Sequence, residues 1–127
     1  MKRDLDLIRD ILLDVESAPS DSLTIYDLAK NHVASPDLVF YQIQLLKEAQ
    51  FIKVRYFMRV LTPDSKKYDD IKISRLTLQG HDYLDTIRNN DIWRKTKESL
   101  VKVGTSVAFS TITRIASRLL ESYLPPL

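Results

Sequence analysis

The feature that most constrains the fold of this chain is a change of hydrophobic period near residue 51. Before it, apolar side chains recur at helical spacing in three segments, residues 4–16, 25–34 and 36–50. After it, residues 51–60 alternate apolar and charged side chains, as a half-buried strand does, and residues 71–76 form the natural return strand. Helical spacing resumes after Thr77. We therefore expect an α+β chain, mainly helical, with three helices, a hairpin and a closing helix.

The second and third of these helices are separated by a very short connection. Thr24, followed three residues later by Asp27, forms a weakened capping box for the second helix. Ser35 and Pro36 supply the N-cap and the first helical position of the third. Two helices that follow one another so closely indicate a helix-turn-helix.

The hairpin is predicted to have arms of about ten residues, joined by the charged segment LTPDSKKYDD at residues 61–70. Alternation assigns the residues of the first arm to two faces. The apolar face holds Val54, Tyr56, Met58 and Val60, and the other face holds Lys53, Arg55, Phe57 and Arg59.

Three helices, a hairpin and a closing helix in this order make a winged helix-turn-helix domain, and two local motifs agree with it. IQLLKEAQFI at residues 43–52 resembles the end of the third helix in many winged-helix repressors, with Gln50 where glycine is usual. RLTLQGHDYL at residues 75–84 resembles the exit from the hairpin, where Gly80 allows the closing helix to pack closely. The alternative is a different small α+β module.

Several longer stretches together resemble one particular family. They are MKRDLDLIRDIL, YQIQLLKEAQFI, RLTLQGHDYLDTIRNNDIWRKTK and a C-terminal amphipathic helix, and residues 85–97 are the most specific part. The chain is similar to an uncharacterised family of domains of unknown function, number twenty-five thirteen, found in phages and prophages of bacteria. The resemblance implies a phage or prophage context and no particular chemistry.

The composition argues against several classes of function. The chain has no cysteine, and its two glycines, Gly80 and Gly104, are too far apart to form a phosphate-cradling loop. No metalloprotease or serine-hydrolase motif is present, and His32 and His81 are expected at surface or packing positions. We expect no enzyme activity, cofactor or metal. With a charged amino end and no run of about 18 apolar residues, the expected location is the bacterial cytoplasm, away from membranes.

The charge distribution leaves two functions open. The hairpin region, residues 51–75, carries net charge +4, whereas residues 36–50 carry −1. In a DNA-binding domain the third helix would present Tyr41 and Gln44 to base edges. The phosphate contacts would come from the hairpin cations Lys53, Arg55, Arg59, Lys66, Lys67 and Lys72.

The alternative is a protein-interaction adaptor for a host or phage protein. The exposed side of the third helix would then offer Leu38, Phe40 and Tyr41 to the partner, and Asp37 and Glu48 on the same helix suit DNA poorly. The hairpin cations would be a solvated sheet edge defended by charge.

Residues 1–88 are assigned to the winged domain and residues 89–127 to a helical extension. Asp91 is the expected cap of a basic helix in which Trp93 is an anchor, and Gly104 separates this helix from a last one, residues 106–124. The apolar arc of this last helix predicts a homodimer. The alternative is packing on its own domain. The residues proposed for dimerisation are Phe109, Ile112, Ile115, Ala116, Leu119, Leu120 and Tyr123.

Overall fold

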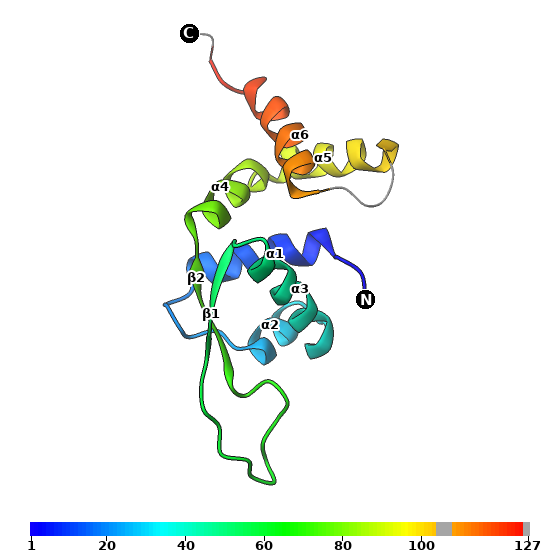
Figure 1. The fold of residues 1–127 in the computed structure, drawn as a ribbon. Coiled ribbons are helices and arrows are strands. Elements are labelled where there is room, and N and C mark those ends of the chain that lie inside the picture. Colours follow the sequence, from blue (N-terminus) through cyan, green and yellow to red (C-terminus); the bar gives the residue numbers. More distant parts are fainter. Residues whose placement is uncertain (104–107, 126–127) are drawn as a thin grey trace. The chain divides into compact units, whose positions relative to one another are not determined.

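The computed structural model describes residues 1–103 and 108–125, and the chain divides into two compact units, Met1–His81 and Asp82–Leu127. Six helices and one two-stranded antiparallel sheet are present among the described residues (Figure 1). In chain order they are α1 (Leu5–Ser17), α2 (Ile25–Asn31), α3 (Pro36–Glu48), β1 (Ile52–Tyr56), β2 (Ile71–Leu76), α4 (Leu78–Ile87), α5 (Asn90–Val103) and α6 (Phe109–Glu121). The expected order of elements is confirmed.

The core of the first unit is formed by the apolar faces of α1, α2 and α3 against the sheet. Fully buried side chains come from each helix and from β2, among them Ile8, Leu12, Leu28, Ile43 and Ile73. These positions recur three or four residues apart along the helices, which is the periodicity that predicted them. Figure 1 shows the three helices gathered beside the base of the hairpin.

Both α2 and α3 begin with the capping contacts that the sequence predicts. Thr24 accepts a hydrogen bond from the Asp27 amide, and the Asp27 carboxylate accepts one from the Thr24 amide, so the capping box is complete. Ser35 caps α3 by accepting from the Leu38 amide, with Pro36 in the first turn. The helix-turn-helix is confirmed, although α2 ends at Asn31 rather than near residue 34.

The hairpin differs from the prediction in the length of its arms. The strands pair only over Ile52–Tyr56 and Ile71–Leu76, with a bulge after Lys53, so arms of about ten residues were wrong. The expected apolar face also ends early, because Met58 and Val60 are fully or largely exposed. The sequence goes on alternating apolar and charged residues beyond the part of the hairpin on which the helices of this unit pack. Figure 1 shows this unpaired part of the hairpin extending beyond the helices of the unit.

The junction of α3, β1 and α4 is tight. Gln50 has φ of 62°, which explains why glycine is favoured at this position of the motif. Gly80 lies against Phe51, the residue after Gln50, since a Cβ built on Gly80 would stand 2.0 Å from the carbonyl oxygen of Phe51. Thr77 caps α4 by accepting from the Gly80 amide at 3.0 Å. The close packing expected at Gly80 is therefore confirmed.

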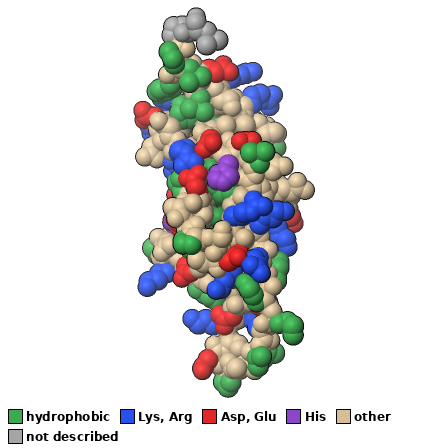
Figure 2. Space-filling view, turned by 90° about the vertical axis from the view of Figure 1, so that its left-hand side faces the viewer, with side chains coloured by type: hydrophobic (Ala, Val, Ile, Leu, Met, Phe, Trp, Pro, Cys, Tyr) green, Lys and Arg blue, Asp and Glu red, His purple; other side chains and the backbone are tan. Residues whose placement is uncertain are grey.

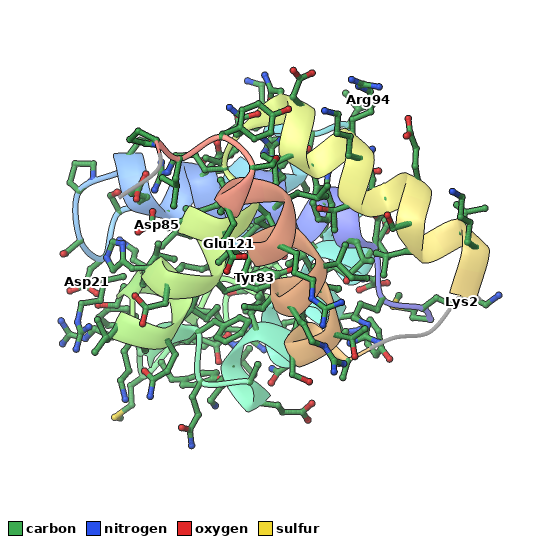
Figure 3. The ribbon with its side chains drawn as sticks, turned by 90° about the horizontal axis from the view of Figure 1, so that it is seen from above. Lys2, Asp21, Tyr83, Asp85, Arg94 and Glu121 are labelled. Carbon is green, nitrogen blue, oxygen red and sulfur yellow. The ribbon has the colours of Figure 1, made fainter. Side chains whose placement is uncertain are left out.

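In the second unit, α5 packs on α6. The side chain of Asn89, not that of Asp91 as predicted, caps α5 by accepting from the Asp91 and Ile92 amides, because the helix begins two residues earlier than expected. Arg94 lies on the outward side of α5, between Asp91 at 3.2 Å and Glu98 at 3.4 Å (Figure 3).

Two sequence expectations for this unit fall partly outside the described residues. They are the break at Gly104 and the first two positions of the last helix, 106 and 107. The division of the chain at residue 88 stays a prediction. Within the described part of the chain, no helix has the length and apolar character needed to cross a membrane.

Candidate nucleic-acid interface

Tyr68 attaches the long loop of the hairpin to the helix-turn-helix. Its side chain is only 5% exposed, and its ring stacks on Phe40 of α3 with ring centres 4.6 Å apart. Its backbone amide donates to the hydroxyl of Tyr26 on α2 at 2.9 Å. One residue of the loop thus contacts both helices of the motif, which fixes the neighbouring loop residues beside them.

The same residue changes the charge presented by the first turn of α3. The hydroxyl of Tyr68 donates to a carboxylate oxygen of Asp37, and the ammonium of Lys67 lies 3.6 Å from that oxygen. The hydrogen bond from Tyr68, followed by the charge of Lys67, lowers the pKa of Asp37. The bond to Asp37 raises the pKa of Tyr68. Asp37, one of the two acids on α3 that suit DNA poorly, is therefore paired with a cation from the loop.

Lys66 and Lys67 are the predicted phosphate ligands that this anchor brings to the helix-turn-helix. Both side chains are exposed, and that of Lys67 is 74% exposed despite its contact with Asp37. The ammonium of Lys66 lies 5.1 Å from the centre of the Tyr26 ring. Lys67 therefore lies at the amino end of α3, and Lys66 lies beside α2.

The other four predicted hairpin cations are placed differently. Arg59 braces the loop, donating to the carbonyl oxygens of Lys66 at 2.6 Å and Lys67 at 3.1 Å. Arg55 is bound to Asp21 at 2.8 Å, and Lys72 lies over the ring of Phe57. Lys53 is exposed near the base of the wing, away from this anchored loop.

The two predicted base-reading residues lie on the side of α3 that the core leaves uncovered. Tyr41 and Gln44 are both half-buried, whereas Val39, Ile43 and Leu46 on the same helix are completely or almost completely buried. No side-chain hydrogen bond of Tyr41 or Gln44 occurs among the described residues. Their polar atoms are thus available to an external ligand.

Sequence reasoning missed the anchor at Tyr68 and a second buried contact at Gln42. Gln42 is fully buried, its amide oxygen accepts from the Asp4 backbone at 2.9 Å, and its amide nitrogen donates to the Lys2 carbonyl at 3.0 Å. A lone aromatic residue in the charged segment 61–70 was a usable signal for Tyr68. No such signal existed for Gln42, because a glutamine on a mainly apolar helix does not by itself indicate a buried contact.

From the end of β1 onward, the hairpin exposes several large apolar side chains. The exposed fractions are 51% for Tyr56, 41% for Phe57, 103% for Met58, 84% for Val60 and 75% for Leu61. Figure 2 shows hydrophobic side chains at the lower end of the molecule, where this loop lies. By contrast, Phe40, expected to be exposed for a partner, has its ring covered by Tyr68.

The residues predicted for dimerisation fall into two groups. Ile112 and Ala116 are fully buried, and Phe109 packs edge-on against Tyr83 with ring centres 5.0 Å apart. Ile115, Leu119 and Leu120 are half-buried. Tyr123 is 51% exposed, and its hydroxyl accepts from Lys95 at 2.8 Å. Among these residues, the apolar surface that stays in contact with solvent lies at the end of α6 and at Tyr123, just after it.

The two histidines each face carboxylates on α1. His32 Nε2 lies 2.6 Å from Asp14, and His81 Nδ1 lies 3.6 Å from Glu16. Across residues 1–103 and 108–125, no group of three or more acidic, histidine or cysteine side chains is arranged to hold a metal ion.

Comparison with solved structures supports the fold. A crystal structure of MarR matches 93% of this chain and 72% of its own, with a TM-score of 0.51 and 17% sequence identity. A structure of Streptococcus pneumoniae FabT in complex with DNA matches 94% of this chain and 73% of its own, with a TM-score of 0.44 and 16% identity. The likeness to MarR agrees with a winged helix-turn-helix of α+β class.

Comparison of sequences identifies the family. An uncharacterised protein of Haemophilus influenzae (strain ATCC 51907 / DSM 11121 / KW20 / Rd) is 28% identical over 131 residues, covering 98% of this chain and 99% of that protein. A family model described as hypothetical protein (DUF2513) matches residues 2–106. The match extends over most of the winged domain and α5, so the chain belongs to the DUF2513 family.

Proposed function

We propose that this protein is a non-enzymatic regulator of the bacterial cytoplasm that binds double-stranded DNA. The exposed side of α3 would enter the major groove, and the loop anchored by Tyr68 would contact the adjacent phosphates. The observation that carries the proposal is the burial of Tyr68 between α2 and α3, which holds Lys67 beside the amino end of α3 and Lys66 beside Tyr26 of α2.

The chemistry of the two parts is complementary. The amide of Gln44 pairs with the edge of adenine, and Tyr41 contacts a phosphate or a thymine methyl group. The lysines supply affinity without sequence preference, because neutralising phosphates releases counterions. The pairing of Asp37 with Tyr68 and Lys67 reduces the repulsion between α3 and the phosphates.

The test is a fluorescence anisotropy titration of a mixed-sequence duplex at about 50 mM salt. Wild-type protein is expected to bind, and the Lys66→Ala/Lys67→Ala variant to bind about tenfold more weakly, because two phosphate contacts are lost. The matched control is Lys2→Ala/Lys102→Ala, which removes the same charge at two other exposed positions. Equal losses in both variants would contradict the assigned contacts.

A second candidate function is the protein-interaction adaptor, favoured by the exposed apolar run from Tyr56 to Leu61. Soluble proteins seldom expose so many large apolar side chains in one short segment unless a partner covers them. The same titration separates the two candidates. Absence of duplex binding by wild-type protein at about 50 mM salt would remove the first candidate and leave the adaptor.

We further propose that two chains associate through the carboxyl-terminal half of α6 and the residues just after it, where Leu119, Leu120 and Tyr123 leave apolar surface in contact with solvent. A two-fold dimer would place two α3 helices on one duplex. Light scattering of the full chain tests this, and a monomer mass throughout the accessible concentration range would contradict it.

A phage or prophage origin is part of the same proposal and rests on the sequence resemblance alone. It predicts that genes for family members lie among phage genes. Inspection of the genes adjacent to members in sequenced genomes tests it, and consistent placement among unrelated housekeeping genes would contradict it.

A further inference from the structure

A separate pocket lies at the base of the wing, where the end of α3, the two strands and the start of α4 meet. Its volume is about 640 Å³, which is in the range of small-molecule sites. Three cations from three different elements line it, namely Lys47 of α3, Lys53 of β1 and Arg75 of β2. Among the residues that the structure describes, no acidic side chain lines it.

The charge in this pocket is less compensated than the charges of Arg55 and Lys67 on the same hairpin. Lys47 donates to the hydroxyl of Tyr56 at 3.0 Å, and Arg75 donates to the backbone carbonyl of Leu76 at 3.0 Å. Both acceptors are neutral. Arg55 and Lys67, by contrast, each contact a carboxylate. Across the described ranges, no ion pair involves Lys47, Lys53 or Arg75, so the three positive charges remain uncancelled.

The start of α4 adds to the positive potential. Leu78 and Gln79 are in the first turn of this ten-residue helix and line the pocket. Their backbone amides have no partner within the helix, and the helix dipole is positive at this end. The side chain of Thr77 accepts a hydrogen bond from the amide of Gly80, the residue after Gln79.

We propose that this pocket binds a small multivalent anion of the phosphate class, free or esterified, as a ligand distinct from DNA. Three uncancelled cations match an anion with two or more charges. Val54 and Leu78, the latter 74% exposed, provide an apolar wall for the organic part of an ester. The loop residues assigned to the DNA interface, Lys66 and Lys67, do not line the pocket. Lys53 of β1 does line it, although the sequence pattern groups Lys53 with the phosphate-binding cations.

The test is an NMR titration of the ¹⁵N-labelled full chain with inorganic pyrophosphate, with ionic strength held constant by chloride. Saturable shifts are expected at the backbone amides of Lys53, Arg75, Leu78 and Gln79. The Lys53→Ala/Arg75→Ala variant is expected to bind about tenfold more weakly. Both side chains are exposed, so unchanged amide positions elsewhere in its spectrum will show that it folds.

The matched control is Lys66→Ala/Lys67→Ala, which removes the same charge from the same hairpin and is expected to keep the saturable shifts. Shifts that do not saturate, or that spread equally over all hairpin cations in both variants, would overturn the proposal. It would also be overturned if pyrophosphate gave no saturation and the Lys53→Ala/Arg75→Ala variant lost duplex affinity, since these cations would then be DNA contacts.

Discussion

Two segments of the hairpin carry large apolar or aromatic side chains, and they differ in what surrounds them. Tyr68 is buried against Tyr26 and Phe40, while Met58 and Val60 lie in solvent. Hydropathy alone would rank the second segment as the more buried of the two. The difference arises because the chain returns past α2 and α3 at Tyr68, whereas none of the described helices packs on Met58.

The comparison shows how a mostly unpaired loop is held in a defined place. Strand pairing in the hairpin ends at Tyr56 and Ile71, so the position of residues 66–68 depends on the contacts of Tyr68 with the helices. Tyr68 therefore positions the loop, and the exposed apolar side chains from Tyr56 to Leu61 stay free for other contacts. Substitutions in the two segments are therefore expected to have very different effects.

The largest effect is expected from Tyr68→Ala. Removing a buried aromatic ring leaves a cavity beside Phe40, so the free energy of unfolding should fall by about 3 kcal/mol. Urea denaturation measures it. The control is Met58→Ala, which removes a large side chain from a fully exposed position of the same hairpin. Similar losses in the two variants would break the distinction between the segments.

An intermediate effect is expected from Tyr68→Phe, which keeps the ring and removes the bond to Asp37. The pKa of Asp37 should rise towards its ordinary value of 3.8, as followed by NMR of the carboxyl group. Because the folded pKa is lowered, the pairing stabilises the fold above the unfolded pKa and is lost as pH falls through the folded value. The stability difference between wild type and variant should therefore shrink in acid. A difference independent of pH would contradict the pairing.

The smallest effect on stability is expected from Met58→Ser/Val60→Ser. Both side chains are in solvent, so the free energy of unfolding should change by no more than about 0.5 kcal/mol. Thermal denaturation of the full chain measures it. A marked loss would mean that the run is covered in solution, as in contact with a second subunit.

Much of the fold could be predicted from the sequence, because local rules set it. Several local features depend on only one or two residues each. They are the helix caps at Thr24 and Ser35, the left-handed backbone conformation at Gln50 and the close approach of the backbone at Gly80. The length of the strands was not predictable in this way. Their end depends on which helices lie above them, and alternation from Tyr56 onward carries no information about that.

The candidate site was only partly visible for the same reason. Composition and spacing located the hairpin cations and the face of α3 that holds Tyr41 and Gln44. They did not reveal that Tyr68 pairs with Asp37, a residue thirty-one positions away, or that Arg55 is bound to Asp21. Such contacts are set by tertiary structure, and they divide six similar cations into groups with different roles.

The most direct test of the account is the salt dependence of duplex binding by wild-type protein and by Lys66→Ala/Lys67→Ala. If the anchored loop places both lysines on phosphates, the slope of log K against log salt should decrease in magnitude by about 1.8, because each lost contact removes about 0.9. Lys2→Ala/Lys102→Ala should keep the wild-type slope. An unchanged slope for Lys66→Ala/Lys67→Ala would contradict the proposal that Tyr68 anchors a DNA-binding loop.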